Sequence, residues 1–244
     1  MTAPQKMPLL NISPSTFRAI ETELSKPPFY GIGLGPALND SLMIEFFDGL
    51  KGWGLLARWK NRARYLKYWL RPLRSQKASA PLPDGSILVT WYQSTPRLDE
   101  MILPVLAELD GSPHEVLYGL PNVAPRIPAQ VPARWWDQVL SYDVAAWRAE
   151  YRRCRPEWSR RLKGVCRNFN LPAGSFETLF LNLLLASQMV AGCLDFLERN
   201  RPALVLTEYD RNRLWSCLVL AARRLGIPTI TLVHGIIGTE AVSY

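Results

Sequence analysis

Hydrophobic residues follow two different periods near the end of the chain. Apolar runs at residues 203–207 and 229–233 have the length of buried strands, whereas the apolar positions between them return every three or four residues, as on one face of a helix. Asp210 is expected to cap this helix, and Gly226 and Pro228 are expected to end it. A strand, a helix and a second strand joined by short links predict a parallel pair of strands.

A second unit of the same kind comes earlier in the chain. Residues 87–91 form an apolar, β-branched run that predicts a strand, and Thr95 followed by Pro96 is typical of a helix N-terminus. Pro104 lies inside the helical pattern that follows, so we expect that helix to bend or restart. Residues 115–120 predict the next strand. Two such units predict an α/β fold with a Rossmann-like parallel sheet flanked by helices.

Two long helices are predicted between these units. They cover residues 144–167 and 176–200, with a break at residues 170–175. Residues 178–196 approach the length of a membrane span, but polar side chains recur among them and the apolar positions have helical spacing. We therefore predict a buried amphipathic helix. The proline-rich segment at residues 121–133 predicts a connection without helix.

The first 80 residues differ in pattern from the rest of the chain. Residues 1–40 are rich in Pro, Ser and Gly, with one helix predicted at residues 15–24. From residue 40 to 74, large apolar side chains recur at helical spacing, and two glycines divide the segment into two predicted helices. We predict an N-terminal arm with a basic, aromatic helical segment at residues 1–80, and the Rossmann-like domain at residues 85–244.

Positive charge is concentrated in one segment. The 244 residues carry 29 Lys or Arg and 21 Asp or Glu, a net charge of +8. Residues 51–77 contain nine of these cations and no acid, so the other 20 cations nearly balance the 21 acids. Trp and Tyr beside the cations suit a helix that lies on an anionic membrane surface. A helix packed on its own domain with a solvated basic face is the alternative, and nucleic-acid binding is the least favoured interpretation.

Several classes of site have no support in the sequence. The four cysteines share no CxxC spacing, so we predict buried free thiols and neither a disulfide framework nor a metal site. No P-loop, HExxH or GxSxG motif occurs, and His114 is expected to be a turn residue. The start of the chain lacks the pattern of a secretory signal. This predicts a cytoplasmic protein, which could bind the inner face of a membrane through its basic segment.

Candidate chemistry lies where the predicted strands end, because parallel sheets bind ligands at the carboxyl ends of their strands. Gln93 and Arg97 follow the first of these ends, and Glu208 and Asp210 follow the second. His234 follows the last strand, which is expected to be buried on both faces. An imidazole at this place can take a proton from a sugar hydroxyl or bind a phosphate, or it can fix the turn.

The loop after that strand carries further candidate groups. Glu240 lies six residues after His234 and could share its pocket. Gly235 and Gly238 would let backbone N–H groups approach a ligand, and Thr239 lies beside them. These residues predict a binding loop at the carboxyl edge of the sheet.

Residues 201–235, RPALVLTEYDRNRLWSCLVLAARRLGIPTITLVHG, resemble the N-terminal domain of GT-B glycosyltransferase-like proteins of bacterial surface-polysaccharide pathways. Those proteins share a proline before an apolar strand that ends in an acid, a helix followed by Gly-Ile-Pro, and a strand that ends in Val-His-Gly or Gln-His-Gly. The matching positions here are Pro202, Glu208, Asp210, Ala221, Ala222, Gly226, Ile227, Pro228, Val233, His234 and Gly235. The basic, aromatic segment ahead of the first strand is also similar to that group.

The resemblance implies one half of a GT-B fold. This half would bind a surface-glycan or lipid-linked acceptor, and a donor domain expected beyond residue 244 would bind the nucleotide-sugar. It implies no cofactor or metal in this half, and no turnover by the isolated chain. His234 and Glu240 would be catalytic residues. The remaining candidates would bind substrate: Gly235, Gly238, Thr239, Glu208, Asp210, Gln93 and Arg97. The alternative function is a non-catalytic Rossmann-like interaction or scaffold domain at the membrane surface.

Overall fold

The chain divides into two compact units that alternate along the sequence. The computed structural model describes residues 14–38, 55–73, 81–169, 171, 174–208 and 212–232. The helical unit comprises Met1–Pro72, Arg148–Ser187 and Ile237–Tyr244, and the sheet unit comprises Leu73–Trp147 and Gln188–Ile236. The segment 85–244 that the sequence predicts as one domain is thus divided between the two units.

The sheet unit is built on five parallel strands. They are β1 (Ile87–Trp91), β2 (His114–Tyr118), β3 (Ala133–Trp135), β4 (Leu204–Thr207) and β5 (Thr229–Thr231). Their spatial order is β3-β2-β1-β4-β5, and every neighbouring pair is parallel. Helices flank this sheet, which confirms the predicted Rossmann-like α/β fold.

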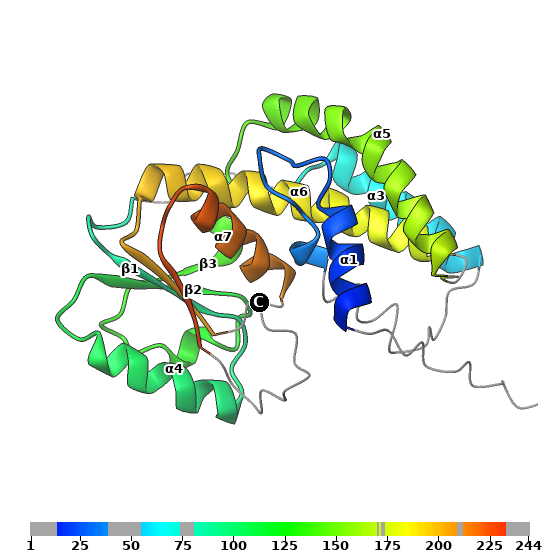
Figure 1. Cartoon of the computed structure of the whole chain (residues 1–244). Coiled ribbons are helices and arrows are strands. Elements are labelled where there is room, and N and C mark those ends of the chain that lie inside the picture. Colours follow the sequence, from blue (N-terminus) through cyan, green and yellow to red (C-terminus); the bar gives the residue numbers. More distant parts are fainter. Residues whose placement is uncertain are drawn as a thin grey trace, which may run out of the picture. The chain divides into compact units, whose positions relative to one another are not determined.

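The two strand–helix–strand connections of this unit pack on opposite faces of the sheet. Helix α4 (Pro96–Glu108) joins β1 to β2, and α7 (Arg213–Arg224) joins β4 to β5. Figure 1 shows α4 on one face, with α7 and the C-terminal part of α6 (Ser175–Asn200) on the other. On the α4 face, Val89 and Trp91 of β1 join a buried cluster with residues of α4. Burying such apolar surface is the main favourable term in folding.

Local sequence signals account for the start of α4. The Thr95 hydroxyl accepts a hydrogen bond from the backbone N–H of Leu98 at 3.3 Å, and Pro96 occupies the first turn. Both features are confirmed as predicted. Pro104 lies inside α4, which continues to Glu108 as one helix and does not restart.

Two expectations about the sheet unit are wrong, and one strand was not predicted. The N-cap of α7 is Asn212 and not Asp210, because the Asn212 side chain accepts a hydrogen bond from the Leu214 N–H at 2.9 Å. Strand β5 is not buried on both faces, since it lies at the edge of the described sheet with Ile230 50% exposed. Strand β3 begins at the end of the proline-rich connection and was not predicted; the Arg134 side chain donates to Glu115 of β2 at 2.6 Å.

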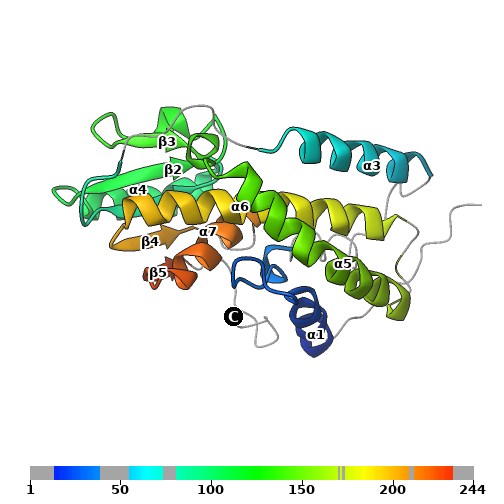
Figure 2. The same cartoon turned by 90° about the horizontal axis from the view of Figure 1, so that it is seen from above.

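The helical unit consists of helices from distant parts of the chain. It contains α1 (Pro14–Leu24), the 3₁₀ turn η1 (Pro36–Leu38), α3 (Leu55–Leu70), most of α5 (Val144–Asn168) and the N-terminal part of α6. Figure 2 shows α3, α5 and this part of α6 running beside one another. The helices predicted at residues 15–24, 144–167 and 176–200 are therefore confirmed.

Helix α6 is the one described helix that is long and apolar enough to cross a membrane. However, 78% of its most apolar window is buried inside the protein. Its polar residues Ser187 and Gln188 are buried as well, and the Ser187 hydroxyl donates to the Leu184 carbonyl at 2.7 Å. The prediction of a buried helix is confirmed.

None of the four cysteines forms a disulfide, and Cys154, Cys193 and Cys217 are buried. Cys166 is only partly buried. Within the described residues, no three His, Cys, Asp or Glu side chains lie together as metal ligands. Free thiols were predicted, and the structure has them.

Candidate functional site

The carboxyl ends of β1 and β4 lie side by side in the middle of the sheet. Thr90 of β1 pairs in register with Thr207 of β4. From these ends the chain enters α4 on one face and α7 on the other, so the strand order reverses at this point. In open α/β sheets this topological switch point is where ligands bind.

Glu208 is the first residue after β4 and occupies this switch point. Its side chain is completely buried. One carboxylate oxygen accepts hydrogen bonds from the backbone N–H of Tyr92 and from the indole N–H of Trp215, the latter at 3.0 Å. The other oxygen accepts from the Thr90 hydroxyl at 2.7 Å. Glu208 therefore links the end of β1, the end of β4 and the first turn of α7.

Burial controls the ionisation of this carboxyl group. Desolvation raises the pKa of Glu208 from its ordinary value of 4.5 to about 7, against hydrogen bonds from Thr90, Tyr92 and Trp215 that favour the ionised form. A carboxyl group with a pKa near neutrality can both release and hold a proton under physiological conditions.

The two threonine hydroxyls form a short relay with this carboxyl group. Thr90 lies 2.9 Å from the Thr207 hydroxyl as well as 2.7 Å from Glu208, but it has only one hydroxyl hydrogen. When Glu208 is ionised, Thr90 donates to it and accepts from Thr207. When Glu208 is protonated, it can donate to Thr90, which then donates to Thr207. The direction of hydrogen-bond donation along Thr207, Thr90 and Glu208 thus reverses when Glu208 is protonated.

Close packing fixes Tyr92 beside this carboxyl group. Gly119, directly after β2, donates from its backbone N–H to the Trp91 carbonyl at 2.9 Å. A Cβ atom on Gly119 would come within 2.7 Å of the Tyr92 carbonyl oxygen. The rings of Tyr92 and Trp215 meet edge to face, with centroids 6.4 Å apart. The strand ends therefore approach so closely that only glycine fits at residue 119.

No protein family, curated protein or solved structure matches this chain. Its family membership remains a prediction from the resemblance in residues 201–235.

The predicted site residues are only partly within the described chain. Glu208 is central to the switch point, whereas Gln93 and Arg97 are exposed, just after β1 and in the first turn of α4. The contacts of Glu208 come from Thr90, Tyr92 and Trp215 rather than from either of them. The remaining candidates lie outside the described residues: Asp210, His234, Gly235, Gly238, Thr239 and Glu240.

The other histidine, His114, begins β2. Its ring Nδ1 donates to the Ser112 carbonyl at 2.8 Å, so it packs against the turn before the strand. His114 was expected to be a turn residue, but it is the first residue of β2 and lies at the amino end of that strand, away from the carboxyl ends of the strands.

Sequence reasoning missed the three partners of Glu208. Thr90 is the only polar residue of β1, Ile-Leu-Val-Thr-Trp, and that was the available signal. Trp215 has the spacing of a core residue on α7, and this pattern gives no indication that its indole N–H makes a polar contact. Tyr92 contributes a backbone group, and no side-chain pattern can indicate that contact.

Proposed function

We propose that the sheet unit is the acceptor-binding half of a GT-B-type glycosyltransferase, which transfers a sugar from a nucleotide-sugar to a surface glycan or lipid-linked acceptor. The observation that carries this proposal is the buried Glu208 at the switch point of the β3-β2-β1-β4-β5 sheet. The resemblance of residues 201–235 supplies the reaction class.

In this proposal, Glu208 is a positioning residue. It is buried, and it holds the Tyr92 backbone and the Trp215 indole, so it shapes the strand ends rather than touching substrate. His234 would remove the proton from the acceptor hydroxyl, with Glu240 as the second candidate base. Exposed Gln93 and Arg97 would bind the acceptor.

The loop after β5 would complete the acceptor site. Gly235 and Gly238 would bring backbone N–H groups to the ligand, and Thr239 and Asp210 would add polar contacts. Cations and helix dipoles can stabilise a departing nucleotide diphosphate, so this half requires no cofactor or metal of its own. The nucleotide-sugar would be bound by a separate donor domain.

The test is a sugar-transfer assay with the complete gene product. The protein is incubated with tritiated UDP-, GDP- and CMP-sugars and a glycolipid fraction extracted from cells of the same organism. We expect labelled glycolipid with the wild type, and loss of about 100-fold or more in rate for His234→Ala, as is typical when a general base is removed. His114→Ala is the matched control and should retain the wild-type rate. Absence of transfer with every donor, or full activity of His234→Ala, would refute the proposal.

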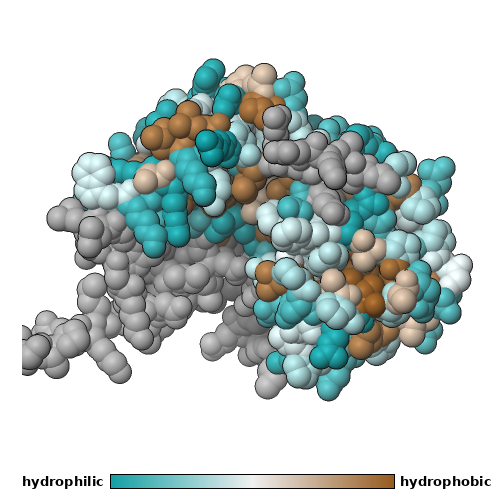
Figure 3. All heavy atoms as spheres, turned by 180° about the vertical axis from the view of Figure 1, so that it is seen from behind, coloured by the Kyte–Doolittle hydropathy of each residue, from teal (hydrophilic) through white to brown (hydrophobic). Residues whose placement is uncertain are grey.

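Helix α3 supports a membrane surface as the partner of this protein. Trp59, Leu66 and Leu70 are 67%, 55% and 63% exposed. Their spacings of seven and eleven residues are close to whole helical turns, so they form one stripe. From behind, hydrophobic surface areas lie directly beside strongly hydrophilic ones (Figure 3).

Exposed cations border the apolar stripe of α3. They are Lys60, Arg62, Arg64, Lys67 and Arg71. The opposite side of the helix is held within the helical unit: Asn61 donates to the Thr178 hydroxyl at 2.9 Å, and the Tyr65 hydroxyl hydrogen-bonds that of Tyr151 at 2.9 Å. A fixed helix that presents apolar side chains between cations suits the interface of an anionic bilayer.

Vesicle flotation tests this partner. We expect the protein to float with vesicles of phosphatidylglycerol and phosphatidylcholine, and to float poorly with phosphatidylcholine alone. The triple variant Trp59→Ser, Leu66→Ser, Leu70→Ser should stay in the soluble fraction. Leu103→Ser, at an exposed position of α4, is the control and should float as the wild type does. Flotation that does not depend on the stripe or on anionic lipid would refute the proposal that α3 binds an anionic membrane surface.

The alternative function is a non-catalytic Rossmann-like scaffold held at the membrane. The apolar stripe of α3 supports this scaffold as well as it supports the transferase. Flotation without sugar transfer would support the scaffold over the enzyme.

A further inference from the structure

A basic groove lies on the helical unit, in a part of the protein that the proposed transferase site does not use. It is formed by α5 with a contribution from α1, and it has a volume of about 660 Å³. Its lining includes four cations and one carboxylate: Arg160, Arg161, Lys163, Arg167 and Glu23. Cavities of this size are typical of small-molecule sites.

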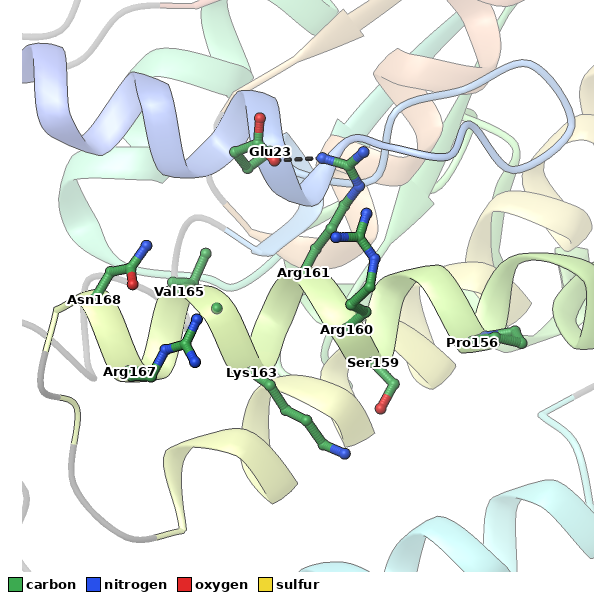
Figure 4. Close-up of a pocket in the computed structure, with 10 residues that line it drawn as sticks. Glu23, Pro156, Ser159, Arg160, Arg161, Lys163, Val165, Arg167 and Asn168 are labelled. Atoms are coloured by element: carbon green, nitrogen blue, oxygen red, sulfur yellow. Dashed lines mark hydrogen bonds and ion pairs between the residues drawn. The ribbon is translucent and has the colours of Figure 1, made fainter.

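Gly164 opens the middle of this groove. It lies inside the 25-residue helix α5, where glycine is a poor helix former. A Cβ atom at this position would meet no atom within 4 Å, so packing does not explain the glycine. Figure 4 shows the side chains of Arg160 and Arg161 on one turn of α5 and that of Arg167 on a later turn. The missing side chain gives a ligand access to the helix surface between cations.

Two cations of the groove, Arg160 and Arg167, remain available to a ligand. The Arg160 side chain is 70% exposed and pairs with Glu157 on its own helix, with Nε to Oε2 at 2.8 Å. Exposed pairs of this kind are weak, so a phosphate can compete for the guanidinium. Arg167 is exposed, with no hydrogen bond or ion pair to the described residues. Arg161, in contrast, is committed to Glu23 and anchors α1.

We propose that this groove binds a diphosphate group. Arg160 and Arg167 lie two helical turns apart, about 10 Å along the axis. This span is wider than one phosphate, and it lets each planar guanidinium bind a phosphate oxygen pair in bidentate fashion. Ser159 and Asn168 add neutral donors at the rim of the groove. The site goes beyond the proposed transferase function and does not depend on it.

Isothermal titration calorimetry with pyrophosphate tests the site directly. We expect binding by the wild type, and a Kd weakened by about tenfold or more in Arg160→Gln with Arg167→Gln, in line with the loss of charge-assisted hydrogen bonds. Arg199→Gln removes a cation of α6 outside the groove and should leave the Kd unchanged. UDP and farnesyl diphosphate then distinguish a nucleotide from a lipid as the source of the diphosphate group.

Substitution of the glycine separates binding from folding. Gly164→Leu should fill the groove and weaken pyrophosphate binding by about tenfold, whereas Gly164→Ala should keep the Kd within about twofold and raise the melting temperature. A wild type that does not bind pyrophosphate, or a Kd that the groove variants leave at the wild-type value, would overturn the proposal.

Discussion

At the scale of single residues, Glu208 is a carboxyl group completely buried at the switch point of the sheet. A buried carboxyl group next to three hydrogen-bond donors is held in place, yet desolvation raises its pKa to about 7. The folded chain therefore keeps a proton on Glu208 over a pH range in which the unfolded chain has lost it. Stability due to Glu208 is then greatest below the ordinary pKa of 4.5 and falls as the pH rises to about 7.

Glu208→Gln removes this pH dependence and keeps nearly the same side-chain shape; the amide oxygen can accept from Tyr92 and Trp215, and the amide nitrogen can donate to Thr90. Between about pH 5 and pH 8, the free energy of unfolding of the variant should rise relative to the wild type by about 2.5 kcal/mol, because the amide that replaces the carboxyl group cannot ionise. Urea unfolding at the two pH values measures this change, and other titrating groups cancel in the difference. An equal gap at both pH values would show that Glu208 does not titrate in this range.

At the scale of elements, periodicity predicted the long helices and the central strand well. Strand β1 covers the predicted residues 87–91. A short apolar run between polar turns is typical of a strand that is buried in a parallel sheet. Strand β3 was missed since it has only three residues and follows Pro132. Strand β3 joins the sheet by parallel backbone pairing with β2, and the Arg134–Glu115 side-chain pair adds a contact that local periodicity cannot indicate.

The cap of α7 shows why helix boundaries are harder to predict than helices. Asp210 and Asn212 are both good N-cap residues, and only the backbone geometry makes Asn212 the cap. The same limit applies to the site: a carboxylate at a strand end was predictable for Glu208, but its partners come from β1, from the residue after β1 and from α7.

We expect Asn212→Ala to weaken α7 and, through Trp215, the contacts of Glu208. Loss of a side-chain cap should lower the free energy of unfolding by about 1 kcal/mol. Thermal or urea unfolding measures the effect, with Asn122→Ala as a control at an exposed loop amide. A variant as stable as the wild type would contradict the assignment of this cap.

At the scale of the whole molecule, the division into two units was beyond the reach of sequence patterns. Most of α5 and half of α6 join the helices of the N-terminal segment, through contacts such as Asn61 with Thr178 and Tyr65 with Tyr151. These residues are more than 80 positions apart, and no local period indicates which helix they meet. Helix α3, in the basic segment that was predicted to bind a membrane surface, thus has one side packed and one side exposed.

We propose that the carboxyl edge of the sheet, around Glu208, binds the acceptor. Hydrogen exchange measured by mass spectrometry, with and without the glycolipid fraction used in the transfer assay, tests it most directly. We predict slower exchange at residues 92–95 and 119–122, which follow β1 and β2, and unchanged exchange at residues 111–114, at the amino end of β2. Unchanged exchange at the carboxyl edge, or protection confined to the amino edge, would contradict the claim.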